Sequence, residues 1–237
     1  MEQATILTVQ VGRVRRLGSP DATDPMMRAW TSGIFKAPVS GPVWFGVEQI
    51  DGDEQANRDA HGGQDKAVCG YPAEHLRAWA AELGLDGIAN GGFGENLTLF
   101  NLLEDGVCIG DSFRAGEVVL QVSQPRGPCW KLARRWQRSD LAIRADETGR
   151  TGWYFRVLQE GHLQAGDPLE LLERPNPQWT IRRAYQALRA PAANPQESLA
   201  LAALAQLSAA SRESLLRGLE QGKRAPRRST LIGDNEG

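Results

Sequence analysis

The segment 123–132 contains the residue best suited to chemistry, Cys129, with Arg126 and Lys131 on either side of it. Two prolines stiffen this segment, and Gly127 between them lets the backbone pass close to a ligand. Neighbouring cations and a helix N-terminus favour the thiolate form of a cysteine, which binds soft metals and attacks electrophiles. The alternative is a buried structural cysteine, and the residue types leave both interpretations open.

The segment 52–68 is dense in polar side chains and is typical of a loop. Arg58 could hold a phosphate through two hydrogen bonds, and His61 could donate a hydrogen bond or bind a metal. Gly62 and Gly63 would let the backbone approach an anionic ligand closely. Each signal is weak alone, because a lone histidine is more often structural and a Gly-Gly pair is more often a turn. Only proximity to the cysteine segment would make them one site.

A third segment, 91–98, is a glycine-rich loop that runs into an expected strand. Glu95 and Asn96 would project near the start of that strand and could contact a ligand. The alternative is turn chemistry, in which Asn96 bonds its own backbone. The segment lacks the preceding strand, the following helix and the Lys-Ser/Thr pair of nucleotide-binding motifs, so we exclude a nucleotide loop here.

The remaining cysteines and histidines provide no second candidate site. Cys69 and Cys108 are flanked by apolar residues, so we expect both in the core. His75 and His162 lie at spacings that form neither a zinc set nor a Ser-His-Asp arrangement. Three scattered cysteines also argue against a disulfide framework and are too few for an all-cysteine iron–sulfur cluster.

The overall composition excludes several classes of protein. The 237 residues include 27 Lys and Arg against 29 Asp and Glu, and this near-neutral charge argues against a nucleic-acid-binding protein. No apolar run is long enough to predict a membrane span, and the amino terminus does not have the pattern of a signal peptide. We therefore expect a cytoplasmic protein that does not interact with membranes.

The first two thirds of the chain have the pattern of short strands separated by turns. β-branched and apolar residues indicate strands at 9–14, 43–45 and 118–122. Gly-Asp pairs at 110–111 and 166–167 predict turns that lead into further strands. Many short strands with glycine and proline between them point to a mainly β barrel or sandwich. Helical spacing predicts two peripheral helices, at 72–84 and 131–138.

The composition changes at 174–177, where two prolines favour an extended linker. We therefore predict a β-barrel domain over 1–175 and a small all-α domain over 178–237. Helical signals in the second domain cover 180–188, 195–207 and 211–219. Ser211 is expected to be the N-cap of the last helix, and Gly222 is expected to end it.

The basic stretch 223–228 near the end of the chain has two interpretations. A solvated, frayed terminus is the more common explanation of such a stretch. The alternative is that the helical domain and its basic end bind nucleic acid or a partner protein. Binding that is lost at moderate salt would indicate charge attraction alone.

Taken together, these segments resemble the MOSC family, the molybdenum-cofactor-binding β-barrels related to the C-terminal domain of molybdenum cofactor sulfurase. Within that family the resemblance is to the bacterial YiiM subgroup, and the helical tail after Pro177 is similar to the three-helix domain of this subgroup. The matching motifs are GDEQA at 52–56, HGG at 61–63, DKA at 65–67, YPAEH at 71–75, FGENL at 93–97, GD at 110–111, SQPR at 123–126 and PCWKL at 128–132.

The resemblance implies a MOSC-type β-barrel with peripheral helices, followed by a small three-helix domain. It implies that the thiolate of Cys129 binds the molybdenum of a molybdopterin cofactor, with the pterin dithiolene and oxo groups as the other ligands. It also implies catalytic roles for Cys129 and His61. By their positions in the family pattern, the residues expected to contact the cofactor or the substrate are Arg58, His61, Gly62, Gly63, Glu95, Asn96, Arg126 and Lys131.

The activity implied by the resemblance is the reduction of N-hydroxylated compounds, including base analogues such as 6-N-hydroxylaminopurine, to the amine. The chain has no flavin or nicotinamide motif, so the electrons would come from a separate flavin or iron–sulfur reductase. Pyridoxal phosphate is not required for this chemistry. The alternative is a carrier that passes molybdenum cofactor or activated sulfur to another enzyme without turnover of its own.

Overall fold

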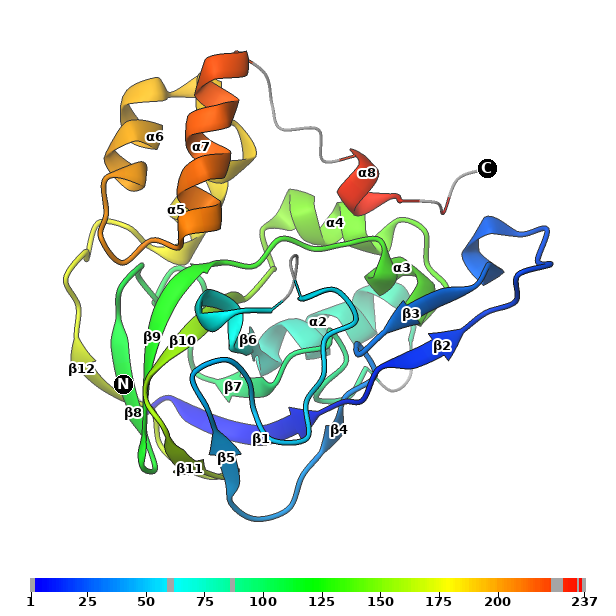
Figure 1. Cartoon of the computed structure of the whole chain (residues 1–237), viewed down its shortest axis with the longest axis horizontal. Coiled ribbons are helices and arrows are strands. Elements are labelled where there is room, and N and C mark those ends of the chain that lie inside the picture. Colours follow the sequence, from blue (N-terminus) through cyan, green and yellow to red (C-terminus); the bar gives the residue numbers. More distant parts are fainter. Residues whose placement is uncertain (1–2, 59–61, 86–87, 223–227, 234, 236–237) are drawn as a thin grey trace.

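A computed structural model of the chain describes residues 3–58, 62–85, 88–222, 228–233 and 235. Its main element is one curved sheet of eight strands, which pair in the order β12-β8-β9-β10-β6-β7-β1-β4 (Figure 1). The strands are β1 (Thr5–Val11), β4 (Ala37–Pro38), β6 (Val68–Pro72), β7 (Leu97–Phe100), β8 (Ser112–Ala115), β9 (Val118–Pro125), β10 (Trp153–Gln159) and β12 (Glu170–Glu173). All neighbours are antiparallel except β6 and β7.

The sheet curls back on itself through backbone hydrogen bonds between β1 and the turn before β12. Ile6 N donates to Asp167 O over 3.1 Å, and Ile6 O accepts from Gly166 N over 2.8 Å. Leu169 N donates to Ala4 O over 2.9 Å. These bonds pair backbone groups that would otherwise form an open edge. The predicted fold class, a mainly β barrel with peripheral helices and a helical C-terminal part, is confirmed.

Two small hairpins flank the main sheet. β5 (Val43–Phe45) pairs with β11 (Gly161–Leu163), and β2 (Arg15–Leu17) pairs with β3 (Trp30–Ser32). The β2–β3 hairpin projects from the barrel as an arm, with the 3-10 turn η1 (Pro25–Met27) in its connecting segment (Figure 1). The strand predicted at 43–45 is confirmed at its predicted bounds.

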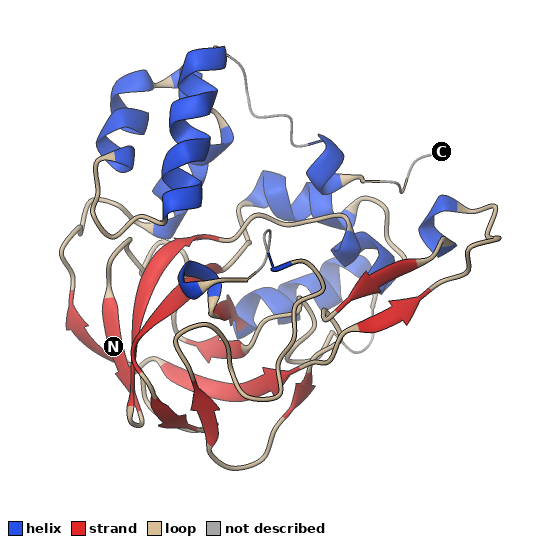
Figure 2. Cartoon of the chain, in the orientation of Figure 1, coloured by secondary structure: helices blue, strands red, loops and turns tan. Residues whose placement is uncertain are grey.

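Helices α2 (Ala73–Leu83), α3 (Lys131–Trp136) and α4 (Leu141–Thr148) cover one side of the barrel (Figure 2). They share a second apolar cluster in which Phe93 stacks between Tyr71 and Trp79, with ring centroids 4.7 and 5.9 Å away. Gly84 ends α2 in the left-handed conformation, as predicted. The helix predicted at 131–138 is present but stops at Trp136, because Gln137 adopts a positive φ of 51°.

The C-terminal helices are α5 (Ile181–Arg189), α6 (Pro195–Ala202), α7 (Ala209–Gln221) and the short α8 (Arg228–Leu231). α6 ends five residues before the predicted 207. The prediction that Ser211 is the N-cap of α7 is wrong: Ser208 occupies the extended cap position, and its hydroxyl accepts a hydrogen bond from Ser211 N at 3.1 Å. Gly222 ends α7, as expected. None of the helices among the described residues is long and apolar enough to cross a membrane.

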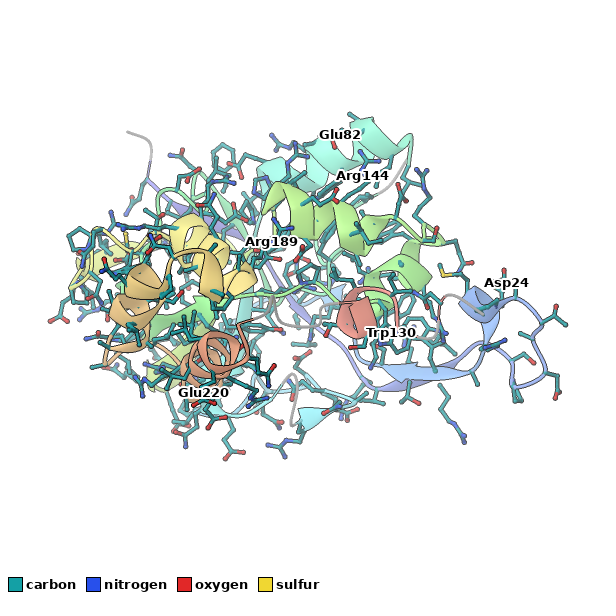
Figure 3. All side chains as sticks on the ribbon, turned by 90° about the horizontal axis from the view of Figure 1, so that it is seen from above. Asp24, Glu82, Trp130, Arg144, Arg189 and Glu220 are labelled. Atoms are coloured by element: carbon teal, nitrogen blue, oxygen red, sulfur yellow. The ribbon has the colours of Figure 1, made fainter. Side chains whose placement is uncertain are left out.

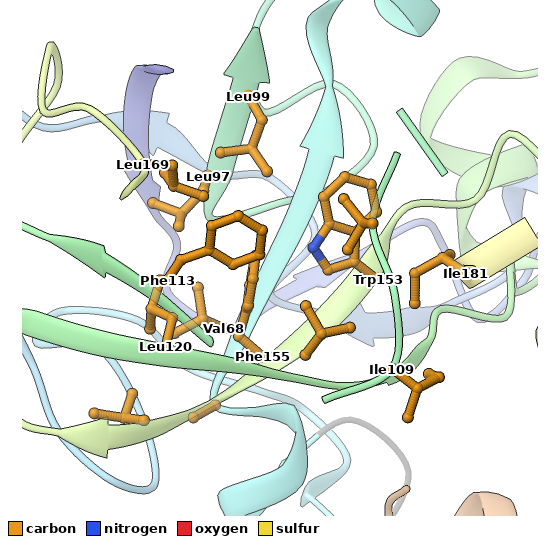
Figure 4. Close-up of a cluster of buried hydrophobic side chains, with 14 of the residues drawn as sticks. Val68, Leu97, Leu99, Ile109, Phe113, Leu120, Trp153, Phe155, Leu169 and Ile181 are labelled. Atoms are coloured by element: carbon orange, nitrogen blue, oxygen red, sulfur yellow. The ribbon is translucent and has the colours of Figure 1, made fainter. Parts of the chain in front are cut away.

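One apolar cluster runs from the barrel into the C-terminal helices (Figure 4). Trp153 and Phe155 of β10 lie at its centre and are fully buried, and Ile181, Leu201 and Leu215 from α5, α6 and α7 belong to the same cluster. The helices therefore pack directly on the barrel and share its core. The division into domains 1–175 and 178–237 stays a prediction.

Replacing Gly152 by alanine is expected to lower the free energy of unfolding by about 3 kcal/mol. Gly152 has a φ of +70°, and a Cβ there would lie 2.3 Å from the carbonyl oxygen of Gly70 in the adjacent strand β6. Gly166→Ala is the matched control, because Gly166 has a φ of +92° but open space around it, so only the backbone strain of about 1–2 kcal/mol remains. Urea unfolding of both variants measures the difference, and equal losses would contradict the steric argument.

Candidate active site

An open pocket of about 610 Å³, including its mouth, lies between the ends of β6, β9 and β10 and the base of the β2–β3 arm. Ser32, Gly33 and Ile34 form the side nearest the arm. The lining residues whose side chains can carry charge, donate hydrogen bonds or bind a metal are Lys36, Asp53, Lys66, Cys69, Asn96, Arg126, Cys129, Lys131 and Tyr154.

Cys129 is half-buried in the loop between β9 and α3, and its side chain lines the pocket. Leu132 N donates to Cys129 O over 3.0 Å, which ties the loop to the first turn of α3. Lys131 also lines the pocket, and its Nζ donates to Thr31 O of the arm over 2.8 Å. The thiol therefore sits between strand β9 and a lysine that is fixed against the arm.

Arg126 directly follows the last residue of β9, is buried, and lines the same pocket. Its backbone N–H donates to Gly152 O over 3.0 Å, and Nη2 donates to Phe93 O. Nη1 is buried without a hydrogen-bond partner, so the N–H groups on this nitrogen of the permanently charged guanidinium remain available to a ligand. Burial would lower the pKa of Arg126, but the neighbouring Cys69, Tyr154, Cys129 and Glu95 outweigh it and raise the pKa.

Cys69 and Tyr154 lie side by side on β6 and β10, where they are register partners. Burial raises the pKa of the Cys69 thiol and of the Tyr154 hydroxyl, with Arg126 acting against burial in both cases. Both groups are therefore protonated at neutral pH and can donate hydrogen bonds into the pocket. The prediction that Cys69 is buried is confirmed, but the residue also lines the site, which the sequence did not indicate.

Asp53 bonds several other residues at the pocket. It is buried, pairs with Lys36, and accepts hydrogen bonds from Gly12 N at 2.8 Å and from Asn96 Nδ2 at 3.0 Å. The other end of the Asn96 amide accepts from Cys69 N at 3.1 Å. Asn96 thus connects Asp53 to the strand that carries Cys69, and both of its amide ends are occupied by protein groups.

Lys66 adds a cation at the mouth of the pocket, from the 3-10 turn η2 (Gln64–Lys66) before β6. Desolvation lowers the pKa of Lys66, and the charge of Asp65 only partly opposes this effect. Among the described residues, no group of three or more His, Cys, Asp or Glu side chains could hold a metal ion. The lining therefore combines one half-buried thiol with Lys36, Lys66, Lys131 and Arg126, a set of groups suited to an anionic ligand.

Three other residues expected at the site, Arg58, Gly62 and Gly63, lie outside the pocket. Arg58 is exposed, pairs with Glu48 at 2.8 Å and borders a separate surface hollow. Gly62 N donates to Arg58 O over 2.8 Å, so this glycine belongs to the same turn, and neither Gly62 nor Gly63 lines the pocket. His61 lies outside the described residues. Cofactor contacts from these four residues stay predictions.

Glu95 is fully buried just behind the pocket and does not line it. Its carboxylate accepts hydrogen bonds from Gly91 N at 2.6 Å, Phe93 N at 2.9 Å and Thr98 Oγ1 at 2.9 Å. Glu95 therefore holds the glycine-rich loop in shape, and that loop supplies the carbonyl of Phe93 to Arg126. Direct contact of Glu95 with a cofactor stays a prediction.

The comparisons with known proteins identify the family. A family model of the MOSC domain matches residues 57–170. The crystal structure of YiiM from Geobacillus stearothermophilus superposes with a TM-score of 0.76 and 37% sequence identity, over 91% of this chain and 99% of that chain. This chain belongs to the MOSC family. Within the family it is similar to the YiiM group, and the subgroup expected from the sequence motifs is confirmed.

Two curated relatives extend the picture of this MOSC protein. The uncharacterized protein YflK from Bacillus subtilis is 47% identical over 158 residues, which cover 67% of this chain and 71% of YflK. A protein named Reductase from Gibberella moniliformis is 38% identical over 190 residues, which cover 78% of this chain but only 32% of the fungal protein. The matched region is therefore only about one third of the fungal protein.

Proposed function

We propose that this MOSC protein is a molybdenum-cofactor-dependent oxidoreductase that reduces N-hydroxylated compounds, such as 6-N-hydroxylaminopurine, to the amine. One observation carries the proposal: the thiol of Cys129 lines the same pocket as the buried Arg126, whose Nη1 has no protein partner. The similarity to a relative named Reductase supports the reaction class.

A molybdenum cofactor suits the groups that line the pocket. The sulfur of Cys129 is the soft donor that a molybdenum–dithiolene centre takes from a protein. The unpartnered Nη1 of Arg126 and the ammonium groups of Lys36, Lys66 and Lys131 offer hydrogen bonds to the cofactor phosphate. Burying an unpaired guanidinium donor costs free energy, and a bound anion would recover that cost.

The proposed reaction breaks one N–O bond, consumes two electrons and two protons, and releases the oxygen as water. When bound, the cofactor supplies a metal centre that exchanges two electrons with the substrate. The residues of this chain position the substrate and provide protons. The hydroxyl of Tyr154 and the thiol of Cys69, both protonated, can donate hydrogen bonds to the leaving oxygen. Lys66 Nζ, whose pKa is lowered by desolvation, holds a proton that it releases more readily than an exposed lysine.

The electrons must reach this pocket from another redox group. We propose that a separate flavin or iron–sulfur reductase supplies them, because the three cysteines of this chain are too few for a cluster. The fungal relative named Reductase supports this arrangement, since about two thirds of its length lies outside the matched region. A cytoplasmic location is part of the proposal, because all three cysteines are free thiols, the form that a reducing compartment maintains.

The test is to produce the protein in a host that makes molybdenum cofactor and to measure both bound molybdenum and pterin fluorescence. We expect molybdenum in stoichiometric amount, and reduction of 6-N-hydroxylaminopurine when reduced methyl viologen supplies the electrons. Protein from tungstate-grown cells is the control and should lose the activity. A protein that contains no molybdenum would contradict the proposal. A loaded protein that turns over no substrate but activates an apo-enzyme would instead support a carrier of cofactor or activated sulfur.

A further inference from the structure

The described end of the chain, residues 228–233 and 235, lies against the loop that carries Cys129, and we call it the C-terminal strap. It includes α8, which is separated from α7 along the chain and lies beside α3 (Figure 1). Viewed from above, Trp130 lies next to the α8 coil (Figure 3). A solvated, frayed terminus was expected from the basic stretch 223–228. Residues 223–227 lie outside the described residues, and the strap that follows them is packed.

The strap bonds both backbone polar groups of Trp130, its N–H and its carbonyl oxygen. Trp130 N donates to Thr230 O over 2.8 Å, and Asn235 Nδ2 donates to Trp130 O over 3.2 Å. Trp130 directly follows Cys129 and is the N-cap residue of α3, where it has no side-chain cap of its own. The partners that fix this residue therefore come from a segment about one hundred positions later in the sequence.

Arg134 connects the strap, Trp130 and the β2–β3 arm. This arginine is buried, and its Nε donates to Asn235 Oδ1 over 2.7 Å. Its guanidinium carbon lies 4.5 Å from the centroid of the Trp130 ring, a cation–π distance. Nη1 donates to Arg28 O of the arm over 3.1 Å. Asn235 is itself buried, with 8% of its surface exposed. Its side chain bonds two groups at once, Trp130 O at the start of α3 and Arg134 Nε within it.

Gly233 allows the strap to lie directly on the indole of Trp130. It has a φ of +55°, and a Cβ at this position would lie 2.6 Å from atoms of the Trp130 ring. Trp30 contacts the same ring, with centroids 5.9 Å apart. The indole is therefore held by the strap, by Arg134 and by the arm, and a larger residue at 233 would push the strap away.

We propose that the C-terminal strap is a positioning element for the Cys129 loop and that Asn235 is its positioning residue. Groups that orient a metal ligand are commonly bonded by a second layer of residues, and loss of such residues weakens metal binding. Among its described residues, Leu231 is the buried apolar side chain of the strap, and none belongs to either of the two apolar clusters. The polar and ring contacts of the strap act on the loop and on α3. The role of the strap in metal binding rests on the proposed function. Its role in holding the Cys129 loop in place is independent of that function.

The test uses the full-length, cofactor-free protein and hydrogen–deuterium exchange of the peptide 127–133. Asn235→Ala removes the hydrogen bonds of Asn235 to Trp130 O and Arg134 Nε and so loosens the strap, whose Thr230 O accepts from Trp130 N. Exchange of the Trp130 N–H should therefore speed by about tenfold or more, since each bond contributes about 1 kcal/mol. Gly233→Val is the second variant and should act in the same direction through its contact with the indole. Ser229→Ala, an exposed change in the same strap, is the matched control and should leave exchange unchanged. The melting temperature should stay close to that of the wild type in all three.

A second readout is the affinity for molybdenum cofactor, which should fall by about tenfold or more in Asn235→Ala. Asn235→Asp keeps the acceptor for Arg134 and should recover part of this loss. Unchanged exchange of 127–133 in both Asn235→Ala and Gly233→Val would overturn the proposal. Faster exchange throughout the protein would also overturn it, because the strap would then stabilise the whole fold. A wild-type protein that never loads molybdenum would contradict the proposed function and leave the exchange result standing.

Discussion

Replacing Cys129 by serine is expected to lower both molybdenum content and reductase activity by more than about 100-fold, with little change in stability. Loss of residues that only orient a metal ligand typically costs 10–100-fold in metal affinity, and the loss of the ligand itself should cost more. A serine hydroxyl is a hard, weak donor that does not replace a soft thiolate at such a metal. Cys129 is half-buried at the pocket surface, so the substitution opens no cavity in the core.

Two matched variants separate the role of Cys129 from that of thiols in general. Cys108 is buried outside the pocket, with its Sγ donating to Pro177 O over 3.5 Å, and Cys108→Ser should keep molybdenum and activity. Cys69 lines the same pocket but is protonated, so Cys69→Ser should keep the metal and lower only the turnover. Metal analysis and methyl viologen assays of the three variants provide the comparison. Loss of molybdenum in Cys69→Ser but not in Cys129→Ser would reverse the assignment.

Some elements of the fold could be predicted because the residue pattern of the segment favours the same secondary structure that its tertiary packing requires. Residues 43–45 are apolar and form β5, and α2 ends at a glycine whose left-handed conformation its sequence position suggests. β10 was missed although its residues WYFRVLQ are rich in strand formers and alternate between buried and half-buried positions. Its place in the sheet depends on pairing with both β6 and β9. The helix α4 was missed as well, since its eight residues LAIRADET form only about two turns, with Leu141, Ala142 and Ala145 as the buried apolar residues.

The sequence predicted the part of the site that is local and missed the part that depends on register. Arg126, Cys129 and Lys131 are within six residues of one another, and all three line the pocket. Tyr154 joins them only because β10 pairs with β9 and β6 in this register, and no local pattern reveals that pairing. Glu95 had the right type for a ligand, but its oxygens bond the backbone of its own loop, which is the usual alternative for a carboxylate beside glycines.

Glu104 is a buried carboxylate outside the pocket that supports the site through Gly152. It is fully buried, lies 2.7 Å from His75 Nε2, and accepts hydrogen bonds from Thr151 N at 3.1 Å and from Gly152 N at 2.9 Å. Gly152 O in turn accepts from the backbone N–H of Arg126. One carboxylate therefore fixes Gly152, the residue whose carbonyl oxygen bonds the backbone of the buried cation Arg126.

Glu104→Ala is expected to lower the free energy of unfolding by about 3–5 kcal/mol at neutral pH, because each buried hydrogen-bonding group left without its partner costs about 1–3 kcal/mol. The variant leaves His75 and two backbone N–H groups without an acceptor. Glu82→Ala is the matched control, because Glu82 pairs with Arg144 and Arg150 on the surface and such pairs contribute at most about 1 kcal/mol. Urea unfolding of both variants measures the two losses, and similar values would contradict the assigned role.

The pH dependence gives an independent check on Glu104. Burial alone would raise its pKa, but the hydrogen bond and charge of His75 and the N–H of Gly152 outweigh burial and hold the pKa below its ordinary value of 4.5. A carboxyl whose pKa is lower in the folded state stabilises the fold above pH 4.5, and this contribution is lost as the pH falls through the folded-state pKa. The stability gap between wild type and Glu104→Ala should therefore narrow as the pH falls below 4.5. A gap that widens on acidification would show that the buried carboxyl is held protonated instead.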